Sequence, residues 1–340
     1  MKILFITRKY PPQIGGMEAF SFGLINNIKC DKEIIALNKK QIHLLWWLPY
    51  ALILTLFKAR RVEHIHLGDG LLAPIGFLIK KIYRKPVSVT VHGLDITYNN
   101  FIYQNINVRA LKHLDKIICV SSSTKQDCIE KGVSESIIEI IPNGIDINKF
   151  SIFNFQFSSS QNKILLTVGR LVKRKGVEWF IKEVMPKLDQ NIIYLIAGDG
   201  PEMQNIHHQI INLNLEHRVK LLGRISHEKL IELYNTADLF IMPNIHVKGD
   251  TEGFGIVALE AGACGLMTLA TDIDGIRDVI KDNENGYLLP DRDALMWANK
   301  VNEIIKSDYE RIKICSYIHR NYSWREITNQ YKKIWESKKH

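Results

Sequence analysis

Two carboxylates eight residues apart flank a glycine-containing turn in the second half of the chain. They are Glu252 and Glu260, within the run TEGFGIVALEAG from Thr251 to Gly262. Gly253 and Gly255 allow close backbone approach, and the apolar residues after them predict a helix. Free N–H groups at a helix start bind anions, and the carboxylates on either side suit hydroxyl groups. The pattern therefore indicates a site for a nucleotide sugar.

Two other interpretations fit the same residues. Any α/β enzyme has helix starts flanked by Gly and Glu, so the turn can equally serve helix packing. The pattern Gly253-x-Gly255-x-x-Ala258 also fits a dinucleotide-binding turn. It follows a polar loop (residues 244–250) rather than a strand and lies late in the chain, which disfavours that second interpretation.

Two cations stand on a glycine-edged loop after the apolar run 164–168. Arg170 follows Gly169, and Lys175 precedes Gly176. The two cations suit a diphosphate leaving group, although a solvated basic turn would have the same composition.

The first half repeats the pattern of strand, glycine turn and helix. Gly15 and Gly16 follow an expected strand at residues 3–7 and precede an expected helix at 17–28, so they could present backbone N–H groups to an anion or form a flexible turn. His92 ends an expected strand at 86–91, a position where open α/β sheets bind ligands.

No metal site is expected. His64 and His66 alternate with apolar residues on a short strand and lack a nearby third ligand. Asp272 and Asp274 form a literal D-x-D, the metal–diphosphate signature of another class of sugar transferase, but the pattern is short and follows a strand in a glycine turn. The 5 cysteines are spread widely without a C-x-x-C pair, which predicts reduced thiols.

The elements that must position these residues alternate between strand and helix over the whole chain. The 340 residues suit two α/β domains, and the polar run 158–162 is the expected linker. We expect an N-terminal acceptor-side domain at 1–157, a nucleotide-sugar-binding domain at 158–310, and C-terminal helices at 311–340. No leader sequence is evident, so a cytoplasmic location is expected.

Positive charge is concentrated in the first half. Residues 1–150 hold 20 Lys and Arg against 12 Asp and Glu, whereas residues 151–340 hold 25 against 24. No nucleic-acid-binding motif accompanies the charge, which disfavours that partner. Residues 42–57 are strongly apolar but short for a bilayer span and contain Pro49; they predict a core helix or an interfacial helix. With the basic residues that follow, the segment 42–61 predicts peripheral contact with an anionic membrane.

The sequence as a whole resembles the retaining glycosyltransferases of family 4, which have the GT-B architecture of two Rossmann-like domains facing across a cleft. The resemblance spans nearly the whole chain. The matching pieces are Gly15-Gly16, His92-Gly93-x-Asp95, Pro142-Asn143-Gly144-x-Asp146, Gly169-Arg170 with Lys175-Gly176, Ala197-Gly198-x-Gly200-Pro201, the Glu252 and Glu260 pair, and Tyr322-Ser323-Trp324.

The resemblance implies a role for each matching residue. The donor diphosphate would meet Arg170, Lys175 and the glycine-rich turns, while Glu252 and His92 would contact the transferred sugar. Glu260 would bind the ribose, and the last helix would return to the first domain. The implied catalytic set is Arg170, Lys175, His92 and Glu252. The implied donor-binding set is Gly15, Gly16, Gly169, Arg224, Gly253, Phe254, Gly255, Ile256 and Glu260.

The implied activity is metal-independent transfer of a hexose-type sugar, with retained configuration, from a nucleoside diphosphate sugar to a glycan or glycolipid. No cofactor is implied. Two loops depart from the family pattern: residues 261–267 lack the usual proline, and Asp274 replaces a common glycine. These departures leave the sugar and the base, UDP or GDP, open.

The basic, tryptophan-bearing first half favours a membrane-held acceptor in lipopolysaccharide or cell-surface polysaccharide biosynthesis. The alternatives are a nucleotide-sugar 2-epimerase of the same fold, a nicotinamide- or flavin-dependent oxidoreductase, and a non-catalytic membrane-docked protein. The oxidoreductase lacks a G-x-G-x-x-G after the first strand, and the nearly complete donor set disfavours a non-catalytic protein.

Overall fold

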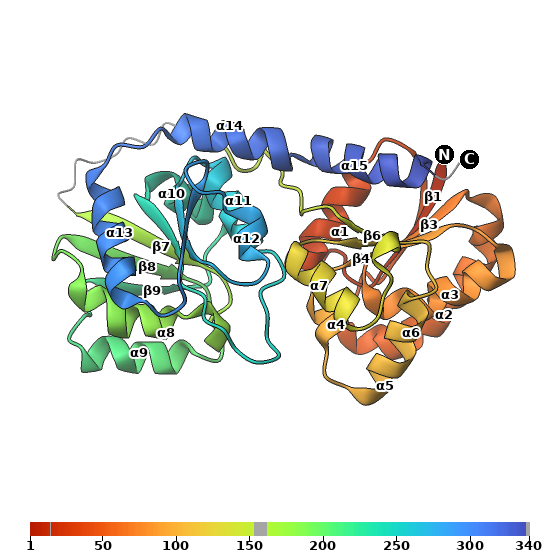
Figure 1. Cartoon of the computed structure of the whole chain (residues 1–340), viewed down its shortest axis with the longest axis horizontal. Helices are drawn as coiled ribbons and strands as arrows, with labels where there is room; N and C mark the ends of the chain where they lie inside the picture. Colours follow the sequence, from red (N-terminus) through yellow and green to blue (C-terminus); the bar gives the residue numbers. More distant parts are fainter. Residues whose placement is uncertain (14, 153–161, 338–340) are drawn as a thin grey trace. The chain divides into compact units, whose positions relative to one another are not determined.

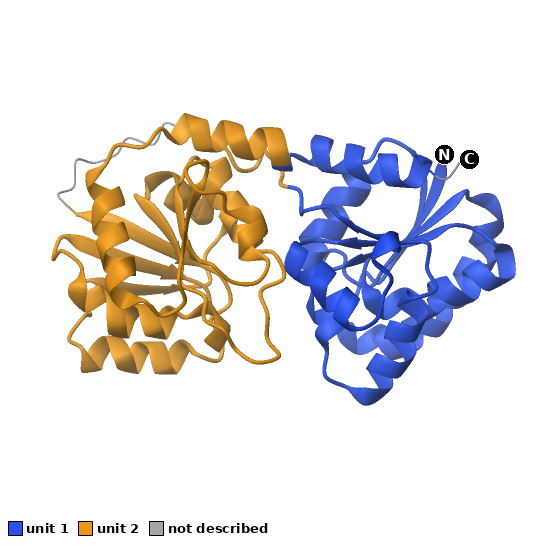
Figure 2. Ribbon diagram, viewed as in Figure 1, with its two compact units in different colours: residues 1–144, 322–340 blue, residues 145–321 orange. Residues whose placement is uncertain are grey.

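The computed structural model describes residues 1–13, 15–152 and 162–337. The chain forms two compact units, residues 1–144 with 322–340 and residues 145–321 (Figure 2). The boundary expected between 157 and 158 lies outside the described residues, as does most of the expected linker.

The first unit is built on a six-stranded parallel sheet in the order β2-β1-β3-β4-β5-β6 (Figure 1). Its central strands are apolar on both faces because helices cover both sides of a parallel sheet; residues 3–6 are at most 1% exposed. The strands are β1 (Lys2–Thr7), β2 (Asp31–Ala36), β3 (His64–Leu67), β4 (Val87–Val91), β5 (Lys116–Cys119) and β6 (Ile138–Ile140).

Helices connect these strands and cover the sheet. The longer ones are α1 (Gly16–Asn27), α2 (Leu44–Lys58), α3 (Ala73–Tyr83) and α7 (Ser122–Glu130), and short ones are α4 (Leu94–Thr97), α5 (Phe101–Tyr103) and α6 (Arg109–Leu111). The side chain of Ser121 accepts a hydrogen bond from the N–H of Thr124 and caps α7, as the sequence predicts.

The second unit repeats this architecture with a sheet in the order β12-β11-β10-β7-β8-β9. Its strands are β7 (Lys163–Val168), β8 (Ile192–Ala197), β9 (Val219–Gly223), β10 (Leu239–Met242), β11 (Thr268–Thr271) and β12 (Gly286–Leu289). Its helices are α8 (Val177–Trp179), α9 (Met203–Asn212), α10 (His227–Thr236), α11 (Ile256–Ala263), α12 (Ile276–Val279), α13 (Ala294–Lys306) and α14 (Arg311–Tyr322). The expected pair of Rossmann-like sheets is therefore confirmed.

The chain ends in the first unit, as the family resemblance implied. Helix α15 (Trp324–Glu336) packs against α1, and the Trp324 ring fills the space above Gly23 and Gly144. Its buried face is also tied to the sheet: the hydroxyl groups of Tyr331 and Thr90 lie 2.8 Å apart, and the indole N–H of Trp335 donates to Ser88. The last helix is thus an integral part of the first unit.

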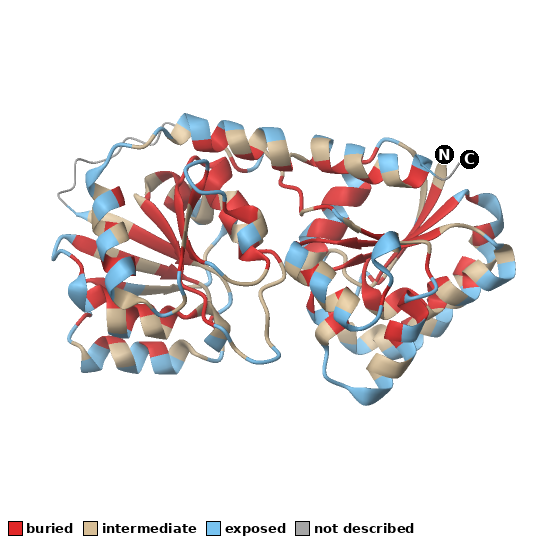
Figure 3. Cartoon of the chain, viewed as in Figure 1, coloured by how far each residue is buried: buried red, intermediate tan, exposed pale blue. Residues whose placement is uncertain are grey.

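The apolar segment 42–57 is both a core helix and an exposed one. Together with short 3-10 turns at its ends, α2 extends over Gln41–Arg61, 21 residues, which is long and apolar enough to cross a membrane by length and composition. Trp47, Ala51 and Thr55 are buried against the sheet, whereas only 22% of the most apolar window is buried. One face of this helix therefore belongs to the protein core, and the rest of it is largely unburied (Figure 3).

Candidate active site

The second sheet has its topological switch point between β7 and β10. From β7 the chain adds β8 and β9 on one side, then β10, β11 and β12 on the other. Open α/β sheets bind ligands outside the carboxyl ends of the strands at such a point. Gly169 follows β7 there, and the loop after β10 leads through Glu252 to α11. The fold therefore brings the two predicted parts of the donor site to one sheet edge.

Glu252 is the centre of a charged cluster at this edge. The amino group of Lys175 lies 2.6 Å from Oε2 of Glu252, and the guanidinium of Arg174 lies 2.7 Å from the same oxygen. Asn244 donates a third hydrogen bond to it at 3.2 Å, and Arg174 also pairs with Asp250 at 2.9 Å. The Glu252 side chain is only 12% exposed. Burial opposes its ionisation, but Lys175 and Arg174 outweigh burial and lower the carboxyl pKa below its usual value.

The backbone of Glu252 is held by the loop after β11. Its N–H donates to Oδ2 of Asp274 at 3.0 Å, and its carbonyl accepts from the N–H of Gly275 at 3.1 Å. Asp274 adopts a left-handed φ of 47°, where a glycine would be unstrained. Asp272 pairs instead with Arg277. The two aspartates of the D-x-D thus serve separate local contacts, and one of them positions Glu252.

The predicted helix start is present at α11. Gly255 adopts a left-handed φ of 84° and precedes the first residue of the helix, Ile256. Phe254, 3% exposed, anchors the turn in the core. Gly253 lies between Glu252 and Phe254. Because Phe254 holds the turn in the core, the free backbone N–H groups at the start of the helix are held in place as well.

Glu260 lies about one turn into α11 and has a partner of its own. Its carboxylate accepts a hydrogen bond of 2.9 Å from the hydroxyl group of Tyr234 on α10. Burial raises the Glu260 pKa to about 7, against the opposing effect of that hydrogen bond. A carboxylate that titrates near neutrality and already has one hydroxyl donor can accept further hydroxyl groups such as those of a ribose.

Glycines end three neighbouring strands of the second sheet. The N–H of Gly169 donates to Ala197, and that of Gly198 donates to Gly223, which ties together the ends of β7, β8 and β9. A Cβ on Gly198 would lie 1.8 Å from the carbonyl oxygen of Gly169, so no side chain fits there. Arg170, directly after this junction, is exposed.

Arg224 is the most open of the predicted site residues that pair with a carboxylate. Its side chain is 86% exposed and lies 3.2 Å from a carboxylate oxygen of Asp199, which follows β8. The two residues thus stand beyond the ends of adjacent strands. An ion pair this exposed contributes little to stability, so Arg224 is free to reorient toward a ligand.

The first unit carries the other predicted residues at the carboxyl edge of its own sheet. Its switch point lies between β1 and β3. Exposed Gly15 and Gly16 begin α1, and a Cβ on Gly15 would lie 2.4 Å from a carboxylate oxygen of Glu18. Glu18 pairs with Lys9 at 3.1 Å, so the turn is held by an ion pair.

His92 is fixed in orientation after β4. Its Nε2 donates to the carbonyl of Gly68 at 3.1 Å, its ring packs edge-on against Phe20, and its backbone N–H donates to Asp95 at 2.8 Å. Among the residues the structure describes, Nδ1 has no hydrogen-bond partner. Because Nε2 carries the proton in this arrangement, Nδ1 of the neutral ring is an acceptor.

A buried pair lies beside His92 that sequence reasoning did not single out as part of a site. Asp69 follows β3 and binds Arg8 at 3.0 Å, and Arg8 in turn donates to Gln41 at 2.9 Å. Sequence reasoning also did not assign site roles to Arg174, Asn244, Asp250 and Tyr234 in the second unit. Arg174 lies in the same basic run as Lys175, and Asn244 and Asp250 bound the polar loop before Glu252, whereas Tyr234 left no local signal.

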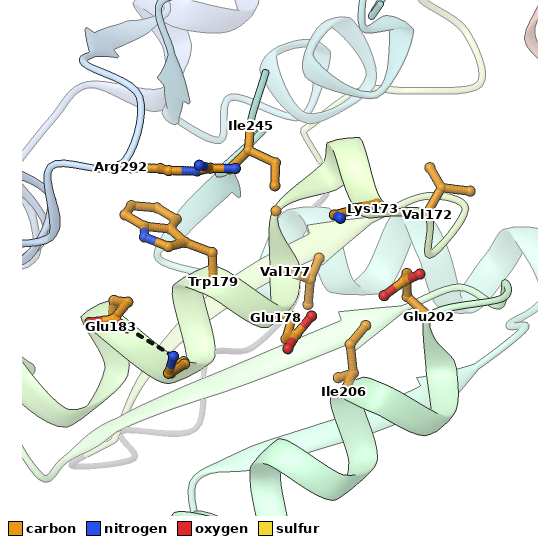
Figure 4. Close-up of a pocket in the computed structure, with 12 residues that line it drawn as sticks. Val172, Lys173, Val177, Glu178, Trp179, Glu183, Glu202, Ile206, Ile245 and Arg292 are labelled. Carbon is orange, nitrogen blue, oxygen red and sulfur yellow. Dashed lines mark ion pairs between the residues drawn. The ribbon is translucent and has the colours of Figure 1, made fainter. Parts of the chain in front are cut away.

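A pocket of about 270 Å³ opens beside the Lys175 loop (Figure 4). It is lined by residues of that loop, of α8 and α9, and by Ile245 and Arg292. None of the predicted site residues lines it, although Lys173 and Gly176 lie on either side of Lys175 in sequence. The predicted residues of each unit lie instead on the loops and helices that follow the strands of that unit's own sheet.

Comparison with known proteins identifies the family and the fold. A family model described as Glycosyl transferases group 1 matches residues 148–321, and one described as Glycosyltransferase Family 4 matches residues 4–149. An uncharacterized glycosyltransferase of Methanocaldococcus jannaschii is 27% identical over 98% of each chain. The phosphatidylinositol N-acetylglucosaminyltransferase GPI3 subunit of Saccharomyces cerevisiae is 27% identical over 79% of this chain and 62% of its own length.

Two solved structures share the fold over nearly their whole length. Anabaena HepE in complex with UDP superposes with a TM-score of 0.81 at 20% identity, covering 99% of this chain and 100% of that one. The lipopolysaccharide outer core galactosyltransferase WaaB superposes with a TM-score of 0.78 at 18% identity, covering 99% and 100%. The chain belongs to the group 1, or family 4, glycosyltransferases of GT-B fold, enzymes that transfer a sugar from a nucleotide sugar.

Proposed function

We propose that this enzyme transfers a hexose-type sugar, with retention of configuration and without a metal, to a lipid-linked glycan at the cytoplasmic face of a membrane. The product would enter cell-surface polysaccharide or lipopolysaccharide biosynthesis. The donor part of the proposal rests on one observation: Lys175 and Arg174 both bind Glu252, beside the start of α11.

The charged cluster supports a reaction without a covalent sugar–enzyme intermediate. Glu252 shares one oxygen with two cations and an amide, so its carboxylate is a poor nucleophile and a good anchor for sugar hydroxyl groups. In the proposed reaction the acceptor oxygen bonds to the anomeric carbon as the diphosphate leaves from the same face. The acceptor's proton passes to a diphosphate oxygen, and Lys175 and Arg170 stabilise the charge that develops there.

The exposed face of α2 supports a membrane-held acceptor. Ile42, Leu45, Ile53 and Phe57 are between 53% and 88% exposed and recur at helical spacing. Basic residues stand at both ends of the segment: Lys39 and Lys40 precede it, and Arg60 and Arg61 end it. An apolar helix face between basic clusters is typical of helices that lie in the interface of anionic membranes.

The relatives' names point to the same acceptor class. One relative is named for transfer to phosphatidylinositol, and one structural neighbour for the lipopolysaccharide outer core. Another neighbour was solved with UDP-glucose, so uridine nucleotides are the first donors to test.

The proposal is tested by incubating the protein with UDP- and GDP-hexoses and vesicles that contain phosphatidylglycerol and a polyprenyl-diphosphate-linked sugar. We expect a glycolipid product whose anomeric configuration, measured by NMR, matches the donor's. EDTA should not change the rate, and replacing the anionic lipid with phosphatidylcholine should lower it.

Three outcomes would contradict the proposal. An epimerised nucleotide sugar without transfer would assign a 2-epimerase. Activity that requires a divalent metal and is lost in Asp272→Ala would place a metal at the D-x-D. Transfer to soluble glycans at a rate that anionic vesicles do not change would show that the acceptor is not held in a membrane.

A further inference from the structure

An apolar groove of about 620 Å³ lies within the first unit. One wall is α2 through Leu48 and Leu52, and a second is the start of α3 through Leu71 and Pro74. The third is the segment that runs from Tyr98 through α5 to Asn107 (Figure 1). This volume lies within the range of about 300–1,000 Å³ that is usual for small-ligand sites.

The groove is continuous with apolar surface on two sides. The α5 wall exposes Phe101, Ile102 and Ile106 to between 53% and 83%, and the α2 wall carries the exposed stripe described above. Ile102 and Ile106 both line the groove and face solvent. Exposed apolar residues gathered on neighbouring elements are candidates for membrane or ligand contacts.

The far end of the groove is polar and leads to the predicted acceptor-side residue. Tyr103 lines the groove, and its hydroxyl group donates to the carbonyl of Asp95 at 2.6 Å. The Asp95 carboxylate in turn accepts from the backbone N–H of His92 at 2.8 Å and of Gly70 at 2.9 Å. Hydrogen bonds through Asp95 therefore link a residue that lines the groove to His92 at the carboxyl edge of the first sheet.

Charge complementarity selects the kind of ligand. Arg109, exposed, follows Ile106 by three residues, and Lys39 and Lys40 stand before the first turn of the α2 segment. Arg8, bonded to Gln41 in that turn, is paired with buried Asp69 and adds no net charge there. An apolar trough rimmed by cations fits a hydrocarbon chain that carries a phosphate group better than a neutral apolar peptide.

We propose that this groove binds one hydrocarbon chain of a phosphate-bearing lipid acceptor, with the acceptor's head group at the sheet edge beside His92. The inference rests on the proposed function, because it names the part of the protein that recognises the lipid. Membrane docking by the outer face of α2 and chain binding by the groove are separate roles, carried by different residues.

Binding of alkyl phosphates of increasing chain length, titrated by calorimetry below their micelle concentration and without donor, tests the groove directly. We expect the affinity to rise about fourfold per methylene group, or about 0.8 kcal/mol, and to level off once the groove is full. The measurement needs no turnover, so it is independent of the transferase assay.

Two groove-filling variants and one matched control separate the two roles. Leu52→Trp and Ile106→Trp should move the plateau to shorter chains and raise KM for a long-chain acceptor in detergent, with KM for its short-chain analogue unchanged. Leu45→Asn, on the outer stripe and not lining the groove, should weaken vesicle binding while it leaves the chain-length series as in the unmodified protein. Circular dichroism and melting curves establish that each variant is folded.

The failures are distinguishable. The groove is not the chain-binding site if affinity does not depend on chain length, or if the groove-filling variants bind long chains as the unmodified protein does. Either result leaves the proposed transfer to a lipid unaffected. The protein could also form a concentration-dependent dimer that Ile106→Trp disrupts and alkyl phosphates do not affect. That result would assign the groove to contact with a second copy of the chain and contradict lipid binding there. Chain-length-dependent binding without transfer to any lipid would support the groove and contradict the proposed function.

Discussion

The amino group of Lys175 lies 2.6 Å from Oε2 of Glu252, although 77 residues separate them in the sequence. The contact joins the loop after β7 to the loop after β10, the two strands on either side of the switch point of the second sheet. Arg174 binds the same oxygen, so Glu252 keeps a cation when one of the two is removed. Lys175 can therefore be replaced without leaving a buried charge uncompensated.

Replacing Lys175 with Ala should lower kcat by roughly two to three orders of magnitude, because a donor aimed at the developing diphosphate charge is worth that much in a preorganised site. Lys173→Ala is the matched control: it removes the same charge from an exposed position in the same loop and should leave kcat within about twofold. Steady-state kinetics with saturating donor measure both variants. Equal losses in the two would show that only the general charge of the loop matters.

Glu260 should make the unliganded protein less stable at high pH. In the unfolded chain this carboxyl ionises near its ordinary value of 4.5, whereas in the folded protein its pKa is about 7. Folding therefore takes up a proton between these values, and stability is lost as the pH rises through about 7. Glu260→Gln, which keeps an acceptor for Tyr234, should match the unmodified Tm at pH 5 and exceed it at pH 8. A Tm difference that is the same at both pH values would contradict this ionisation.

Gly176→Ala should strongly destabilise the second unit. Gly176 has a φ of 63°, and a Cβ there would lie 1.8 Å from the carbonyl oxygen of Pro243, so backbone must move. We expect a loss of about 3 kcal/mol or more in the free energy of unfolding. Gly249→Ala shares the positive φ but meets nothing within 4 Å, so it should cost about 1 kcal/mol. Chemical denaturation measures both, and similar losses would show that backbone strain alone sets the cost.

Removing the Trp335 ring should release α15 from the first sheet. The side chain is 4% exposed, packs against His64, His66 and Tyr331, and donates to Ser88. Trp335→Ala should cost about 3–5 kcal/mol. Lys333→Ala, exposed on the same helix, should change stability by less than about 0.5 kcal/mol. Hydrogen exchange in α15 that is unchanged in Trp335→Ala would show that the ring is not its anchor.

The strands that are buried on both faces were found from the sequence. Runs such as residues 3–6 and 192–197 are apolar because helices cover both sides of the sheet, and they are visible without any tertiary information. The edge strands β2 and β12 were not predicted. Asp31, Lys32 and Glu33 open β2, and β12 is only four residues long, so neither shows an uninterrupted apolar run.

The amino-acid sequence by itself determined the alternation of strand and helix and the positions of the glycine turns, and it marked Lys175, Glu252 and Glu260 as candidates, because local spacing encodes these features. Only the tertiary structure decided which groups meet: that Arg174 joins Lys175 on Glu252, that Asp274 holds the Glu252 backbone, and that Tyr234 binds Glu260. Those contacts join separate strands and helices. Their distances depend on strand order and loop path, which no local pattern records.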